Sequence, residues 1–228
     1  MLNAESRIIK FPTDRSLGMI SLRDVEHPGE WNEYAEARGK LLVPPDRDVW
    51  LSVSYDAMAN LTPLSALAPS DLQVLSITCN RRFDDAQLRH IENLTGLAGL
   101  ALWETGTGDA AFSSLSGLSN LRWLDIGDTQ IKDEGLAFIH GMSGLEELTL
   151  LNTQISSAGL RHLEGLRKLK RLDLMGTKVD DAGFEILGGL NSLKSLRIID
   201  TEISYPVFAR LKRALPDCQI KYHEFART

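Results

Sequence analysis

The chain repeats itself every twenty-four residues, and no other feature restricts its fold as strongly. Aligned on a leucine, the segments share the pattern LxxLxLxxTx(I/V)xxxG(L/F)xx(L/I)xx(L/M)xx. About seven units cover residues 48–217, and they begin near residues 48, 72, 97, 121, 145, 169 and 193. A period of this length indicates stacked copies of one supersecondary unit, because a single unit cannot bury its own apolar face.

Each unit combines two hydrophobic periods. The LxL portion alternates with period two, which predicts a short strand that turns every second side chain toward the core. The later leucines, such as Leu160, Leu163 and Leu166, recur every three residues and predict one face of a short helix. The strands are expected to pair in parallel in one curved sheet. They should be centred on residues 51–53, 75–77, 100–102, 124–126, 148–150, 172–174 and 196–198.

This repeat resembles that of the leucine-rich repeat family, in the TxIxDxGLxxL variety that is common in bacterial proteins. The resemblance covers about three quarters of the chain. It implies an α/β fold, namely a right-handed β–α solenoid shaped like a horseshoe. Parallel strands would line its concave side, and short helices would form its convex side.

One repeat position departs from the family pattern. Most members hold asparagine at the ninth position, where the side chain ties neighbouring loops together. Here five units hold threonine instead: Thr105, Thr129, Thr153, Thr177 and Thr201. Because a hydroxyl both donates and accepts, a row of threonines can satisfy loop backbone in the same way, and we expect Thr129, Thr153 and Thr177 to be buried and hydrogen-bonded to it.

The two ends of the chain do not follow the repeat and are expected to cap it, because terminal repeats would otherwise expose core. Residues 1–47 predict a β-rich amino-terminal cap that continues the sheet. Within it we expect strands at 7–11, 17–22 and 40–43 and a two-turn helix at 30–38. Residues 218–228 predict a carboxyl-terminal capping strand and a tail.

Composition excludes several classes of protein. Twenty-five Lys and Arg against thirty-one Asp and Glu give a net charge of −6, which is unsuited to non-specific nucleic-acid binding. No apolar run approaches the roughly 18 residues of a membrane span, and the first twelve residues lack the apolar core of a signal peptide. The two cysteines, Cys79 and Cys218, are too few for a disulfide-rich secreted scaffold. We therefore expect a cytoplasmic protein that binds neither nucleic acid nor membrane.

No motif in the sequence predicts a metal site, a cofactor or a catalytic centre. The histidines lack metal-ligand spacing, and the glycines lack the arrangement of a phosphate-binding loop. Asp125 and Asp173 do lie two strands apart, roughly 10 Å at about 4.8 Å per strand, which approaches the carboxylate spacing of an inverting glycosidase. Thr149 stands between them on an open sheet, so we interpret them as solvated carboxylates of a binding face.

Strand alternation identifies the side chains that project outward from the concave side. Several of these positions hold large apolar residues, for which a solvent-facing position offers no folding reason. We take the following as candidate partner-binding residues: Trp103, Trp123, Asp125, Leu151, Asp173, Met175, Arg197 and Ile199. The alternative is that the caps or a second copy of the chain cover them. An acidic margin (Glu104, Asp128, Asp200) and a basic margin (Arg122, Lys170, Lys194) are expected on either side.

The leading hypothesis is a non-enzymatic interaction module that binds a partner protein on its concave face, which is also the role that the family resemblance implies. An effector or adaptor that recruits a substrate to a separate catalytic partner is a second hypothesis. A carbohydrate binder or small hydrolase that uses Asp125, Asp173 and the two tryptophans is a third. The sequence leaves the partner's identity and the oligomeric state open.

Overall fold

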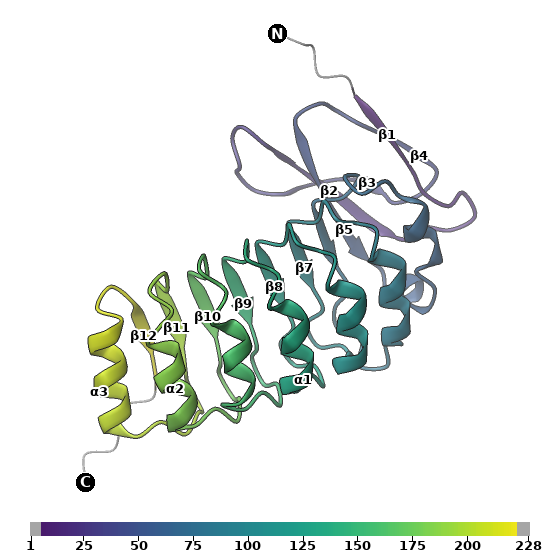
Figure 1. Ribbon diagram of the computed structural model, residues 1–228. Coiled ribbons are helices and arrows are strands. Elements are labelled where there is room, and N and C mark those ends of the chain that lie inside the picture. The colour runs from purple at the N-terminus through teal and green to yellow at the C-terminus, as the bar shows by residue number, and fades with distance from the viewer. Residues whose placement is uncertain (1–5, 223–228) are drawn as a thin grey trace.

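A computed structural model describes residues 6–222, and its strands follow the repeat (Figure 1). Seven of them pair in sequence order, each parallel to the next. They are β5 (Arg47–Val53), β6 (Val74–Ser76), β7 (Gly99–Ala101), β8 (Trp123–Asp125), β9 (Glu147–Thr149), β10 (Arg171–Asp173) and β11 (Ser195–Arg197). The predicted parallel solenoid is thereby confirmed.

The strands after β5 begin and end one residue earlier than the repeat predicts. Each is centred on the buried leucine at the fourth repeat position, such as Leu124 in β8. The backbone then bends toward a residue at the eighth position with a positive φ, such as Asp128 (52°) and Asn152 (52°). Beyond the strand, single backbone hydrogen bonds still join neighbouring units, from the Ile126 N–H to the Thr149 carbonyl at 3.1 Å and from the Asp128 N–H to the Leu151 carbonyl at 2.7 Å.

Short helices cover one side of the sheet and lie next to one another in a row (Figure 1). Most are 3₁₀ helices, in agreement with leucines that recur every three residues. They are η1 (Asp56–Ala59), η2 (Thr62–Ala66), η3 (Asp85–Ile91), η4 (Asp109–Leu115), α1 (Asp133–Leu136), η5 (Ala137–Ile139), η6 (Gly159–Leu163), α2 (Asp181–Leu187) and α3 (Tyr205–Ala214). None of the helices in residues 6–222 has the length and apolar character needed to cross a bilayer.

The amino-terminal segment extends the sheet and adds a separate ribbon. Its elements are β1 (Arg7–Lys10), β2 (Gly18–Asp24), β3 (Asn32–Glu36) and β4 (Lys40–Val43). Strand β2 lies between β3 and β5 and is antiparallel to both, while β1 and β4 pair with each other. At the far end, β12 (Gln219–Lys221) joins β11 in parallel. The strands expected near 7–11, 17–22 and 40–43 and the strand expected within 218–228 are thus confirmed, while the tail expected at 223–228 lies outside the described residues.

The helix predicted at 30–38 is wrong, because this segment contains β3. Its alanines and glutamates favour a helix locally, but a segment this short does not form a stable helix alone. Pairing with the neighbouring strand β2 and the residue before it makes this segment extended instead. The Ala37 backbone donates to the Gly18 carbonyl at 2.8 Å and accepts from the Leu17 N–H at 3.0 Å.

One apolar core runs the length of the molecule between the sheet and the helices. The leucines and isoleucines that recur in every unit are almost completely buried, as in Leu100, Leu124 and Leu148. Burying a side chain of this size contributes about 1.5–3 kcal/mol. Because each leucine packs between neighbouring units, the stack as a whole supplies stability that no single unit has.

Thr129, Thr153 and Thr177 are buried as predicted, with exposed fractions of 6%, 3% and 7%. At the same repeat position, Thr105 is also buried, at 2%, and Thr201 is half-buried. Each hydroxyl donates to the carbonyl three residues earlier, for example from Thr153 to Leu150 at 2.6 Å. The predicted bond to loop backbone is confirmed. It stays within one unit, so the threonines close their own loops and do not tie neighbouring loops together.

Neighbouring units are tied by carboxylates at the starts of the helices. Asp109 accepts hydrogen bonds from the backbone N–H groups of Lys132 (2.7 Å) and Gly135 (3.2 Å) in the next unit. Asp85, Asp133 and Asp181 likewise accept a backbone N–H twenty-three residues on. We call these four residues the aspartate row. They satisfy N–H groups that the first turn of a helix leaves unpaired, with charge of the favourable sign.

We expect Thr153→Val to lower the free energy of unfolding by about 1 kcal/mol in urea titration. The substitution keeps the volume but removes a buried hydrogen bond, while the Leu150 carbonyl retains the backbone N–H of residue 153 at 3.2 Å. Thr201→Val is the matched control and should cost less, because its hydroxyl is only half-buried. A Thr153→Val variant as stable as the parent would show that the buried hydroxyl is dispensable.

Candidate functional site

The face of the sheet opposite the helices, called the concave face below, carries all eight candidate residues. Trp123, Asp125, Asp173 and Arg197 lie on β8, β10 and β11. Trp103, Leu151, Met175 and Ile199 follow the ends of β7, β9, β10 and β11. All eight side chains are partly exposed, and none is fully open to solvent.

The apolar side chains at the seventh repeat position are less exposed than expected, because they pack on their neighbours. Trp103 and Leu151 approach each other over Gly127, where an added Cβ would lie 3.3 Å from Trp103 Cδ1 and 3.2 Å from Leu151 Cβ. The indole N–H of Trp103 donates to Asp128 at 3.0 Å. These side chains therefore form a packed, partly exposed surface that is held in place before any partner binds.

Trp123 lies against the neighbouring strand β7. Its indole occupies the space that a side chain at Gly99 would need, since a Cβ there would overlap three atoms of the ring. Only glycine at this position allows the indole to lie against the sheet. The indole of Trp123 is therefore fixed against the sheet.

Two further tryptophans extend this aromatic surface, and neither was selected from the sequence. Trp50 on β5 donates from its indole N–H to Ser76 at 2.9 Å. Trp31, just before β3, contacts Trp50 edge to face, with the ring centres 5.5 Å apart and the ring planes at 74°. The Arg23 guanidinium lies 4.5 Å from the ring centre of Trp31. All four tryptophans of the chain thus lie on the amino-terminal half of the concave face. Strand alternation places Trp50 outward, but Trp31 falls in the segment expected to be helical.

A pocket of about 210 Å³ lies between Trp31 and Trp123. We call it the tryptophan slot. Val74, which is 3% exposed, contributes an apolar wall. The charged side chains beside the tryptophans include Arg23, Arg122, Glu146 and Glu147.

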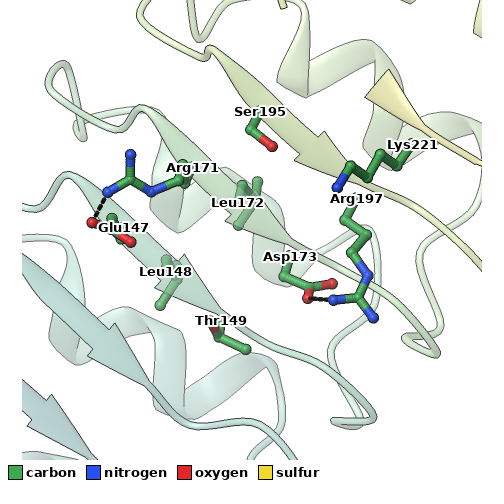
Figure 2. A pocket seen from close by; sticks show the side chains of 9 residues that line it. All are labelled: Glu147, Leu148, Thr149, Arg171, Leu172, Asp173, Ser195, Arg197 and Lys221. Atoms are coloured by element: carbon green, nitrogen blue, oxygen red, sulfur yellow. Dashed lines mark hydrogen bonds and ion pairs between the residues drawn. The ribbon is translucent and has the colours of Figure 1, made fainter. Parts of the chain in front are cut away.

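The carboxyl-terminal half of the concave face is charged instead of aromatic. A second pocket of about 240 Å³ spans β9 to β12, and Figure 2 shows the side chains that line it. We call it the polar pocket. Arg171 pairs with Glu147, and Arg197 pairs with Asp173 at 3.0 Å. Lys221 stands opposite Arg197 in the register of β11 and β12 and makes no ion pair with any carboxylate among residues 6–222.

Asp125 and Asp173 differ in their surroundings. Thr149 lies between them in the register, and only Asp173 lines the polar pocket. Partial burial raises the pKa of Asp125 above its ordinary value, and the nearby charges of Asp173 and Asp128 add to this rise. The hydrogen bond from the Gly127 N–H to Asp125 acts in the opposite direction on the pKa. The Asp173 carboxylate is paired within the chain with Arg197 at 3.0 Å.

The basic margin expected beside the sheet is largely neutralised. Arg122 and Lys170 both pair with Glu146, at 3.9 Å and 2.5 Å, and Lys194 pairs with Asp217 at 3.8 Å.

Residues 6–222 contain no group of three or more His, Cys, Asp and Glu side chains able to hold a metal ion.

The raised pKa of Asp125 has a consequence for stability. A carboxyl whose pKa is higher in the folded than in the unfolded state destabilises the fold once the pH exceeds both values. We therefore expect Asp125→Asn to raise the urea midpoint at pH 7, since the amide oxygen still accepts the Gly127 N–H. The difference from the parent should shrink as the pH falls through the folded-state pKa and vanish below about 3.8. A variant that is less stable at pH 7 would contradict this.

The comparisons with known proteins agree on the architecture. The family model described as leucine rich repeat matches residues 119–179, and no curated protein matches the chain. Internalin F of Listeria monocytogenes is similar at 24% identity and a TM-score of 0.58, over 74% of this chain and 45% of that one. Internalin C2 of the same species has 25% identity and a TM-score of 0.56, over 72% and 66%. A leucine-rich repeat protein of Leptospira interrogans has 21% identity and a TM-score of 0.51, over 71% and 38%.

The chain thus spans less than two thirds of the length of these solved neighbours. Neither the family model nor the neighbours indicate a catalytic family. The repeat pattern, the parallel sheet with its stacked helices and these matches together show a leucine-rich repeat fold, with residues 119–179 matching the leucine rich repeat model directly.

Proposed function

We propose that this chain is a non-enzymatic interaction module that binds a partner protein on its concave face. The observation that carries the proposal is the gathering of all four tryptophans on one half of that face, each still partly exposed. Tryptophan is enriched among the residues that dominate binding energies at protein interfaces. A surface on which several tryptophans gather and stay partly exposed is suited to binding a partner protein.

The order of this surface supports the same role. Hydrogen bonds hold the indoles of Trp50 and Trp103, and contact with β7 holds that of Trp123. Side chains fixed before binding lose less conformational entropy when a partner docks. The paired charges of the polar pocket lie beside them and supply orientation, as charged groups commonly do at interfaces.

The other hypotheses have less support in the geometry. A hydrolase would need Asp125 and Asp173 to face one substrate, and these residues lie in different surroundings. The adaptor hypothesis has no observation of its own. A cytoplasmic location remains part of the proposal and is supported by two unbonded cysteines, of which Cys79 is exposed.

We expect Trp103→Ala and Trp123→Ala each to weaken partner binding by about 2 kcal/mol or more, because truncation removes a large central contact. The partner is recovered from the native host on the immobilised chain, identified by mass spectrometry, and then titrated as a purified protein. Both variants should fold normally, since neither residue belongs to the buried core.

Phe138→Ala is the matched control. Phe138 is a large apolar residue, 38% exposed, in η5 on the opposite side of the molecule. Its truncation should leave the affinity unchanged. If the double variant Trp103→Ala, Trp123→Ala binds like the parent while Phe138→Ala loses the partner, the binding surface is not the concave face.

A further inference from the structure

The tryptophan slot and the polar pocket adjoin each other, because Glu147 lines both. Their volumes of about 210 Å³ and 240 Å³ are smaller than the 300–1,000 Å³ that is typical of sites for small molecules. Each is therefore better suited to one side chain than to a metabolite. Two such pockets in a row on one open face suit a segment of polypeptide that lies across the strands.

The tryptophan slot favours an uncharged side chain. Trp31, Trp123 and Val74 give it an aromatic and apolar surface, and the four charged side chains that also line it are already paired within the chain. Arg23 pairs with Asp48 at 2.7 Å, Arg122 with Glu146, and Glu147 with Arg171. An aromatic or large aliphatic side chain would gain contact with Trp31 and Trp123 without displacing an ion pair.

The polar pocket favours a carboxylate. It contains three cationic and two anionic side chains, although the whole chain carries a net charge of −6. Glu147 and Asp173 are taken up by Arg171 and Arg197, which leaves the ammonium group of Lys221 as the surplus charge. A carboxylate placed between Arg197 and Lys221, which stand opposite each other on β11 and β12, would form charge-assisted hydrogen bonds with both (Figure 2).

The order of the strands sets the distance between these two subsites. The tryptophan slot is centred near β7, between Val74 on β6 and Trp123 on β8, whereas Arg197 lies on β11. Four strand spacings of about 4.8 Å amount to about 19 Å. An extended polypeptide covers this distance in about six residues at about 3.3 Å each.

Building on the proposed function, we propose that the concave face binds an extended, acidic segment of the partner protein. An aromatic or large aliphatic residue of that segment occupies the tryptophan slot, and an Asp or Glu five to seven residues away binds Arg197 and Lys221. Shape and charge thus select the partner at two points of a single segment.

A phage-displayed library of random sixteen-residue peptides, selected against the whole chain, tests this proposal. The expected peptides contain an aromatic or large aliphatic residue and an Asp or Glu at the stated separation. For a synthetic peptide of this kind, Trp31→Ala and Lys221→Met should each weaken binding at least tenfold, while Phe138→Ala leaves it unchanged. Trp31 and Lys221 lie outside the buried core, and urea unfolding verifies that both variants fold.

Selection on the variants separates the two subsites. Peptides selected on Trp31→Ala should lose the apolar preference and keep the acidic one, and those selected on Lys221→Met should show the reverse. Peptides that bind through Trp103 and Trp123 but lack the spaced pair would overturn this proposal and leave the proposed function standing. Enrichment of basic peptides, or of none, would also overturn it. Peptides that are insensitive to every concave-face variant would contradict the proposed function as well.

Discussion

The contact between consecutive repeats is the interaction on which the rest of this structure depends. A single unit has one short strand, one short helix and an apolar face that it cannot bury alone. Leucines such as Leu124 and Leu148 pack into the shared core, and the aspartate row joins four pairs of consecutive units near the starts of their helices. Gly135 and Gly159 permit this junction, since a Cβ at either position would collide with the side chain of Asp109 or Asp133.

Stacking at a constant period also gives the concave face its properties. Because each repeat position recurs on every strand, side chains from distant parts of the sequence become neighbours in rows. Trp123 rests on Gly99, and Trp103 meets Leu151 over Gly127, so small residues in one unit make room for large ones in the next. The same rows bring Asp125 near Asp173, which contributes to its raised pKa. The amino-terminal half of the concave face is aromatic and its carboxyl-terminal half carries paired charges, because different units hold different residues at the same repeat positions.

Features that recur with the period could be predicted from the sequence, and features that depend on non-repeating contacts could not. The parallel strands and the buried threonines follow from the spacing of leucine and threonine alone. The strand β3 was missed because Glu33 and Ala35 favour a helix locally, and only pairing with β2 makes the segment extended. Trp31 was missed for the same reason. Lys221 escaped notice because it lies beyond the last repeat, and only the pairing of β12 with β11 places it beside Arg197.

The four tryptophans allow a direct test of the central claim, that a partner binds the concave face. Their indoles all lie on the amino-terminal half of this face, so a partner that lacks tryptophan and binds over that half removes water from them. The intrinsic emission of the chain is recorded while such a partner, or a tryptophan-free peptide from the selection, is added to saturation. We expect the emission to shift to shorter wavelength and the indoles to become less accessible to acrylamide quenching. If binding is complete by an independent method while both signals stay unchanged, the partner does not contact the tryptophans, which would contradict this account.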